Sequence, residues 1–414
     1  MEQSHTQLIV FLALLLAASG TAICIKWVKM PYAVALVIAG LVIGLSNVAP
    51  HISLAPDLVL TFFLPPLLFE AAWNLNIQVL KRDWLVITAL ATIGVIICMF
   101  TLGGMLYAFC KISMSVGLLL GAMLAATDPV SVIALFRKIG IDQRLTLILE
   151  GESLLNDGTA VVAFQLVLFT MTSAGHWSVA DVVCKFFLVI FGGAMIGAFL
   201  GYVSSLVTSA FDDCMLETSL TIVTAYGSYL IADYFKVSSI IAVVAAGIVI
   251  GNYGRRIGMS PDTRLAVNAF WEYAAFMANS LLFLLIGLQI KLALLANYAG
   301  LITVAVLAAV IARLVAVYGI CYLAPSKRWP IPTAWRHLLF WGGVRGGLAM
   351  ALALSLPSTI AHRGEIINTA FGVVLLTLLV PGLTLDPLIR FLRLAPGSAS
   401  EQPAEKVPAS ICLS

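Results

Sequence analysis

The sequence predicts an all-α polytopic membrane protein with about thirteen transmembrane helices in two inverted repeats, in which the fifth and twelfth helices are interrupted. Three observations predict this fold class. The 414-residue chain is 61% hydrophobic and only 10% charged, which is more apolar surface than a water-soluble core can bury. Apolar runs of about 20 residues, long enough to cross a hydrocarbon layer of about 30 Å, recur along the chain. Two of these runs contain helix-breaking residues.

Hydropathy and the positions of Gly, Pro and charged residues divide the chain into spans. The predicted helices cover residues 8–25, 32–48, 58–76, 84–110, 113–136, 145–172, 180–209, 216–235, 237–253, 265–290, 297–324, 334–356 and 365–391. We expect residues 1–395 to form one transmembrane domain, with repeats at 8–172 and 216–391 joined by the helix at 180–209. The short polar segment 396–414 is expected to be a disordered cytoplasmic tail.

Most of the 23 Lys and Arg residues fall in alternate predicted loops. By the positive-inside rule, this distribution places the N-terminus outside and the C-terminus in the cytoplasm of an inner (plasma) membrane. The 7 cysteines and 5 histidines show no ligand spacing, so we expect no resident metal and no cofactor. The net charge of +3 is small and the basic residues lie in loops, which argues against nucleic-acid binding.

Several charged residues fall inside the predicted spans, where a charge at mid-membrane costs about 2.5–3.5 kcal/mol on insertion scales. Each of them therefore requires a partner or a function. They are Glu70, Asp128, Glu150, Glu152, Asp157, Arg313 and Arg345.

The fifth predicted helix contains Thr127-Asp128-Pro129. Pro129 removes a backbone donor and disfavours helical geometry at Asp128. We therefore expect the helix to unwind from Thr127 to Val130. Unwound backbone at membrane depth is tolerated only within protein or beside a water-filled cavity, where it offers carbonyl oxygens and helix ends to ions.

The twelfth predicted helix contains Gly342-Gly343-Val344-Arg345-Gly346-Gly347. Each Gly costs about 1 kcal/mol relative to Ala in a helix, so this segment is also expected to break or bend. The two interrupted helices are the fifth and the twelfth, and an odd shift in helix order inverts the second copy in the membrane. This placement indicates inverted repeats with an ion site near the midplane, where the breaks meet.

The sixth predicted helix carries polar residues on two faces. Ser153 and Asp157 are four residues apart and share one face, whereas Glu152 and Asn156 form a second pair rotated by about 100°. The Ser153 hydroxyl, the Asp157 carboxylate and the hydroxyl or carbonyl of Thr127 are oxygen ligands that suit a partly dehydrated alkali cation. Glu152 is expected to pair with a buried arginine, because an unpaired buried carboxylate tends to take up a proton. The candidates are Arg313 and Arg345.

The motif Glu152-Ser153-Leu154-Leu155-Asn156-Asp157-Gly158, with the two interrupted motifs, resembles the monovalent cation:proton antiporters of the NhaP and NHE branch, the bacterial Na⁺/H⁺ exchanger type. The resemblance extends in the same order to residues 62–66, 278–288 and 311–313. It implies an NhaA/NhaP-like antiporter fold and a homodimer, in which a six-helix core moves against a dimerisation scaffold.

The resemblance also implies roles for individual residues. Asp157 would carry the ion and the proton, and Asn156 would complete the Asn-Asp pair of electroneutral members. The expected ion-binding residues are Asp157, Ser153, Thr127, Asn156, Glu70 and Asp128. Glu152 would be bridged to Arg313, with Arg345 open as the alternative partner in the same charge network.

The sequence thus predicts a secondary antiporter, not an enzyme, that exchanges a monovalent cation for H⁺. Na⁺ is the first expectation, with Li⁺ and K⁺ as further candidates, and the partners are these ions, membrane lipid and a second copy of the chain. Because Asn156 leaves Asp157 as one titrating carrier, we expect 1:1 electroneutral exchange. A passive cation channel through the same breaks is the alternative. An intramembrane hydrolase would need a nucleophile and base at membrane depth, and His337 has no such partner in the sequence.

Overall fold

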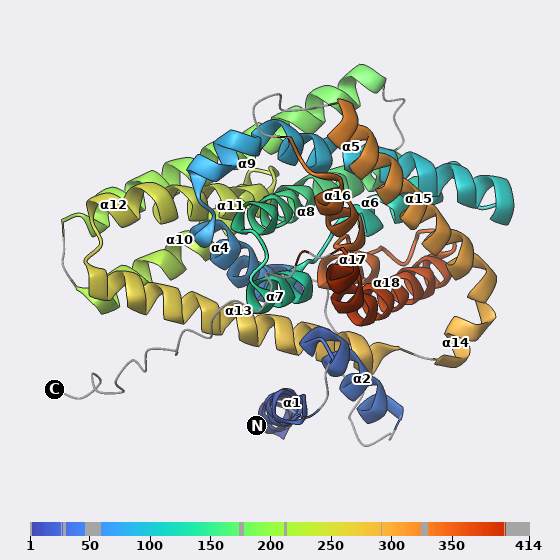
Figure 1. Cartoon of the computed structure of the whole chain (residues 1–414), viewed down its shortest axis with the longest axis horizontal. Coiled ribbons are helices and arrows are strands. Elements are labelled where there is room, and N and C mark those ends of the chain that lie inside the picture. Colours follow the sequence, from blue (N-terminus) through green and yellow to red (C-terminus); the bar gives the residue numbers. More distant parts are fainter. Residues whose placement is uncertain are drawn as a thin grey trace.

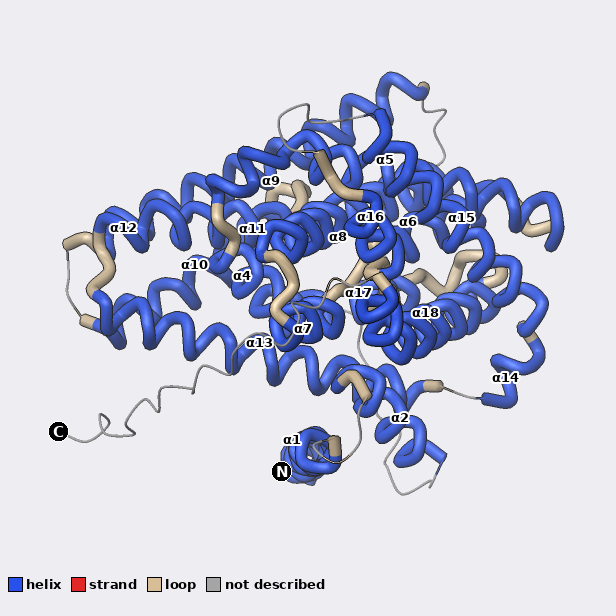
Figure 2. Tube along the Cα trace, in the orientation of Figure 1, coloured by secondary structure: helices blue, strands red, loops and turns tan. Residues whose placement is uncertain are grey.

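The computed structural model describes residues 2–25, 27, 30–45, 59–173, 178–210, 213–290, 292–323, 330–392 and 394. These residues form helices and connecting loops without any strand (Figure 2). The helices are α1 (Glu2–Cys24), α2 (Tyr32–Leu45), the π-helix η1 (Val59–Phe63), α4 (Leu64–Asn74), α5 (Ile77–Cys110), α6 (Met114–Ala125), α7 (Val130–Ile139), α8 (Gln143–Thr172), α9 (Val179–Thr208), α10 (Cys214–Tyr234), α11 (Ser239–Val249), the π-helix η2 (Ile250–Gly254), α12 (Arg255–Ile257), α13 (Pro261–Gln289), α14 (Leu292–Asn297), α15 (Ala299–Leu323), α16 (Thr333–Trp341), α17 (Gly347–Leu354) and α18 (Arg363–Phe391). The predicted tail at 396–414 lies outside the described residues.

The chain is a multi-pass membrane protein. In its described part, 8 helical segments are long and apolar enough to cross a membrane, and two shorter apolar helices lie near the N-terminus. Each predicted span overlaps a helix, which confirms the all-α membrane class. The count of about thirteen crossings and the division into repeats stay predictions.

Two long helices begin earlier than hydropathy predicts, because capping residues set their first turns. α5 begins at Ile77 instead of residue 84, and the Asn76 side chain accepts a hydrogen bond from the backbone N–H of Gln78. α13 begins at Pro261 instead of residue 265, after Ser260, whose side chain accepts from the N–H of Thr263. Polar caps and a Pro in the first turn define these starts, whereas average hydropathy does not register them.

The helices form two groups (Figure 1). In the first, which we call the outer bundle, α11 packs against α4, α9 and α10, and α13 packs against α2, α4 and α10. In the second, the core bundle, α5 packs against α6, α8 and α15, and α18 packs against α15 and α17. Helix α8 contacts α4, α9 and α11 as well as its own bundle, so its polar residues lie near the boundary between the two groups.

Glycines allow the helices of the outer bundle to approach closely. A Cβ atom on Gly197 of α9 would lie 1.9 Å from the carbonyl oxygen of Ala242 on α11. A Cβ on Gly40 of α2 would lie 2.1 Å from the carbonyl oxygen of Leu284 on α13. Both distances are far below van der Waals contact, so these two helix pairs depend on small residues at the crossing.

The side-chain amide of Asn252 forms hydrogen bonds with the turn between α4 and α5, where the chain passes from the outer to the core bundle. α4 ends at Asn74 and α5 begins at Ile77. The Nδ2 of Asn252, in η2, donates to the carbonyl oxygen of Leu75 at 2.9 Å, and the backbone N–H of Ile77 donates to Asn252 Oδ1 at 3.1 Å. Asn252 therefore satisfies one carbonyl and one N–H that the two helix ends leave open.

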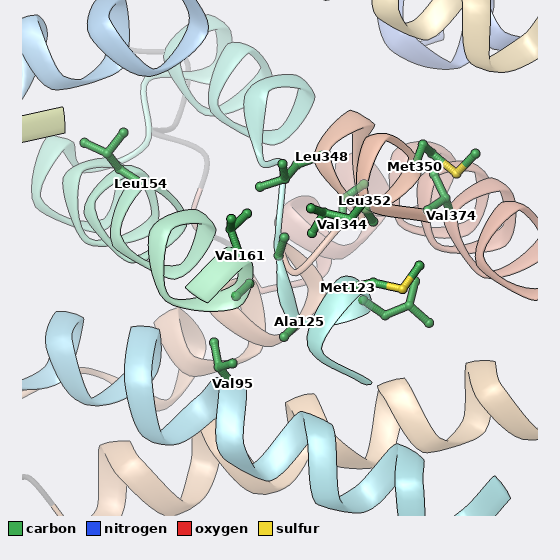
Figure 3. Close-up of a cluster of buried hydrophobic side chains, with 14 of the residues drawn as sticks. Val95, Met123, Ala125, Leu154, Val161, Val344, Leu348, Met350, Leu352 and Val374 are labelled. Carbon is green, nitrogen blue, oxygen red and sulfur yellow. The ribbon is translucent and has the colours of Figure 1, made fainter. Parts of the chain in front are cut away.

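The two predicted interruptions are confirmed. Residues 126–129 separate α6 from α7, one residue earlier than the predicted segment 127–130, since Val130 is already the first residue of α7. Residues 342–346 separate α16 from α17. Figure 3 shows the buried apolar side chains that surround the two unwound segments, among them Met123 on α6, Leu154 on α8 and Leu348 on α17. These side chains pack near the two irregular segments, and non-helical backbone at membrane depth is tolerated only within protein or beside a water-filled cavity.

Candidate ion-binding site

The two interrupted helices are joined where they meet. The backbone N–H of Asp128 donates to the carbonyl oxygen of Val344 at 2.8 Å. Arg345 Nη1 donates to the carbonyl oxygen of Ala125, the last residue of α6, at 2.9 Å. Asp128 Oδ1 accepts from the N–H of Val130, the first residue of α7, at 3.3 Å. A cation thus faces the C-terminal end of one half-helix and an anion the N-terminal end of the other, which complements both helix dipoles.

The two breaks approach each other closely at Gly346 and Asp128. A Cβ on Gly346 would lie 2.1 Å from the Cβ of Asp128. The second break can therefore approach the first only because residue 346 has no side chain, which explains one glycine of the twelfth-helix motif.

Helix α8 is hydrogen-bonded to the first break. Ser153 Oγ donates to the carbonyl oxygen of Thr127 at 2.6 Å, and Asn156 Nδ2 donates to the Thr127 hydroxyl at 3.0 Å. Asn156 Nδ2 also lies 3.4 Å from Glu152 Oε1. Residues from both expected faces of this helix therefore contact Thr127, and Asn156 connects Thr127 to Glu152.

Glu152 pairs with Arg313, which decides between the two arginines that the sequence left open. Arg313 Nη1 and Nη2 donate to Glu152 Oε1 and Oε2 at 2.6 and 2.9 Å, and Glu152 is fully buried. Arg313 Nη2 also donates to the carbonyl oxygen of Leu339 in α16 at 2.7 Å. The bidentate pair therefore joins α8, α15 and α16. Arg345 instead donates a hydrogen bond to the carbonyl oxygen of Ala125 at the end of α6.

A cavity of about 1500 Å³ extends from the crossing of the breaks towards exposed side chains at the ends of α7 and α18. Five of the predicted site residues line it, namely Glu70, Thr127, Asp128, Ser153 and Asp157. The other four, Asn156, Glu152, Arg313 and Arg345, do not. Acidic residues in the wall outnumber basic ones, which favours the entry of cations. The acidic residues are Glu70, Asp128, Glu150, Asp157, Glu272 and Asp386, and the basic residues are Arg137, Lys138 and Arg390.

Asp157 differs from the other buried acid of its helix. Its Oδ1 is buried and has no hydrogen-bond partner within the described residues, although the residue lines the cavity. Glu152 has two bonds from Arg313. A buried carboxylate oxygen without a partner requires a proton or a cation, so Asp157 has the environment of an ion ligand, whereas Glu152 has that of a structural charge.

Sequence reasoning did not assign a role to Asn279, on α13. This residue lines the same cavity, and its Oδ1 is buried with no hydrogen-bond partner among the residues described. Its sequence signals are an amide in the apolar stretch of residues 274–288 and a place in the segment 278–288 that resembles the antiporters. Its oxygen is a further candidate ligand from the outer bundle.

Comparison with known proteins agrees with this architecture. The family model described as sodium/hydrogen exchanger, transmembrane, matches residues 11–391. The low-affinity Na⁺/H⁺ antiporter NhaS1 of Synechocystis is 44% identical over 88% of this chain and 70% of its own length. The Na⁺/H⁺ antiporter NhaH of Halobacillus aidingensis is 39% identical over 92% of this chain and 97% of its own length.

Among solved structures, the sodium proton antiporter MjNhaP1 from Methanocaldococcus jannaschii at pH 8 superposes with a TM-score of 0.79. The match covers 95% of this chain and 99% of that chain at 22% sequence identity. This likeness confirms the predicted NhaP-like fold, and the family match confirms the resemblance seen in the motifs. The chain therefore belongs to the transmembrane sodium/hydrogen exchanger family.

Proposed function

We propose that this protein exchanges a monovalent cation, Na⁺ first among Na⁺, Li⁺ and K⁺, for a proton by competition of the two at Asp157. One observation carries the proposal: Asp157 has an unpartnered buried carboxylate oxygen, among the described residues, in the wall of a cavity that reaches the two helix breaks. The relatives named Na⁺/H⁺ antiporters support cation and proton exchange as the reaction.

In the proposed cycle, Asp157 binds either the cation or the proton, never both. Ser153 and Thr127 supply further oxygen ligands from α8 and the first break, and Glu70 and Asp128 lie along the same cavity wall. The loaded core bundle then moves against the outer bundle and exposes Asp157 on the opposite side. The cavity reaches Arg137, Lys138 and Arg390, all on the predicted cytoplasmic side, so this conformation faces inward.

Exchange is proposed to be electroneutral and 1:1. Glu152 is neutralised by Arg313, and Asp128 and Arg345 face opposite helix ends. Asp157 is then the one group whose charge changes during the cycle. Its carboxylate together with a bound proton or a bound monovalent cation has no net charge. We further propose that the protein is a homodimer in the inner membrane, with its N-terminus outside and its C-terminus in the cytoplasm.

Everted membrane vesicles with a preset proton gradient test the function. Adding Na⁺, Li⁺ or K⁺ in turn should collapse the gradient for at least Na⁺, at a rate that saturates with cation concentration. Clamping the membrane potential at a different value should leave the Na⁺ rate unchanged. A passive channel would instead give cation flux that follows voltage and moves no protons against their gradient. Gradients that survive all three cations would contradict the proposal.

A further inference from the structure

A second cavity, of about 490 Å³, lies between the end of α4 and the α12–α13 corner, next to the ion cavity. Four of its six lining residues are polar or basic. The lining residues are Asn74, Arg255, Pro261, Arg264, Leu265 and Asn268. The mechanism proposed above uses none of them.

The two arginines in this wall have no acidic partner among the residues described. Neither Arg255 nor Arg264 forms an ion pair within that part of the chain. The Arg255 guanidinium lies over the Trp73 ring, 5.6 Å from its centroid. Arg264 uses its Nε to donate to the carbonyl oxygen of Met259 at 3.0 Å, which leaves its Nη groups available. Both arginine side chains are partly buried, so two positioned cations share one pocket.

Neighbouring contacts hold these cations in place. The ring of Trp73 is almost completely buried and supports Arg255 from α4. Two residues of η2, which directly precedes α12, contact the C-terminal end of α4, where Asn74 lines the pocket. A Cβ on Gly251 would lie 2.3 Å from the Trp73 carbonyl oxygen, and Asn252 bonds the α4–α5 corner. The distance between Arg255 and the Asn74 side of the pocket is therefore set by packed backbone.

We propose that this pocket binds the phosphate group of an anionic phospholipid. A guanidinium presents N–H donors in a planar fork that matches two phosphate oxygens, and the guanidinium groups of Arg255 and Arg264 with the amide of Asn268 can surround one phosphate. Leu265 belongs to the same wall and is 70% exposed, which offers an apolar surface to an acyl chain. A free phosphate ion would make no use of it.

The predicted position of the pocket at the cytoplasmic side of the membrane is consistent with an anionic phospholipid as the ligand. The α12–α13 corner, which carries Arg255 and Arg264, is on the predicted cytoplasmic side, where basic pockets between transmembrane helices bind anionic headgroups. Asn74 also lines the larger cavity and donates from Nδ2 to Glu70 Oε1 at 2.8 Å. The lipid would therefore lie next to the entrance of the ion cavity.

Binding can be measured without transport, so its failure is distinguishable from failure of the proposed exchange. The purified full-length protein in detergent is titrated with phosphatidylglycerol, with phosphatidylcholine, and with inorganic phosphate, and bound lipid is quantified by native mass spectrometry. The proposal predicts that phosphatidylglycerol binds at least about tenfold more tightly than either alternative. Phosphatidylcholine carries a cationic choline next to its phosphate, which two arginines repel, and inorganic phosphate has no acyl chain to cover Leu265.

Three single substitutions make the test specific. Arg255→Gln and Arg264→Gln should each weaken phosphatidylglycerol binding about tenfold. Arg256→Gln removes the same charge from an adjacent, exposed residue that does not line the pocket, and should change binding less than about twofold. Equal weakening by all three variants would show a diffuse charge effect and overturn the site. Inorganic phosphate binding as tightly as the lipid would overturn the lipid assignment. Unchanged melting temperatures without lipid confirm that the variants fold.

Discussion

We expect Asp157→Asn to abolish cation-driven proton exchange in reconstituted liposomes, down to the rate of protein-free liposomes, while the protein still folds. The amide matches the carboxylate in shape, but it carries no negative charge and releases no proton, so neither ion can displace the other. Because Oδ1 of Asp157 has no partner in the described structure, an amide oxygen there breaks no hydrogen bond. The measurement is proton flux after a cation jump, with melting temperature as the check on folding.

Asp386→Asn is the matched control. Asp386 lines the same cavity, but it is 43% exposed and pairs with Arg390 on the surface of α18. This substitution also removes one carboxylate, and it should retain more than half of the exchange rate, because Asp386 is exposed and already paired with Arg390 and has no part in the proposed exchange at Asp157. Substantial cation-driven proton flux in a folded Asp157→Asn protein would contradict the assignment of the carrier.

Breaking the Glu152–Arg313 pair has the second largest expected effect, on stability. Glu152→Gln or Arg313→Met each leaves one buried charge without its partner, which costs about 3–5 kcal/mol. Arg313→Met also frees the carbonyl oxygen of Leu339, which Arg313 Nη2 bonds at 2.7 Å. Thermal unfolding in detergent should show a large loss of melting temperature for each single variant.

The double variant Glu152→Gln/Arg313→Met tests whether the two residues act as one buried ion pair or make two independent contributions to stability. Removing both charges together should cost clearly less than the sum of the single losses, because no uncompensated charge remains. Single substitutions in the exposed Asp386–Arg390 pair should each lower the free energy of unfolding by no more than about 1 kcal/mol. Additive losses at Glu152 and Arg313 would contradict the interpretation of this pair as one buried ion pair.

The sequence predicted those parts of the site that depend on local chemistry. Pro129 and the glycines around Arg345 change backbone energetics wherever they stand, so both interruptions could be located from the sequence alone. The four-residue spacing of Ser153 and Asp157 likewise determined that the two share a face. The expected ion-binding residues that line the cavity, Thr127 among them, are mostly those next to a break or on this face.

Contacts between distant segments could not be predicted in this way. Glu152 and Arg313 are separated by 161 residues, and nothing local distinguishes Arg313 from Arg345 as the partner. Asn156 is next to Asp157 in sequence, yet its side chain lies outside the cavity wall, because it bonds Thr127 and Glu152. The pairing of Asn252 with the α4–α5 corner depends on how η2 packs against α4, which hydropathy does not record.

Proton release on cation binding tests most directly whether Asp157 is shared by the two ions. The purified protein is held in weakly buffered detergent solution with a pH indicator, at a pH where the binding site is protonated, and Na⁺ is added. The account predicts the release of about one proton per protomer, saturating with Na⁺ and absent in Asp157→Asn. Saturable Na⁺ binding measured by calorimetry without any proton release from the wild-type protein would contradict it.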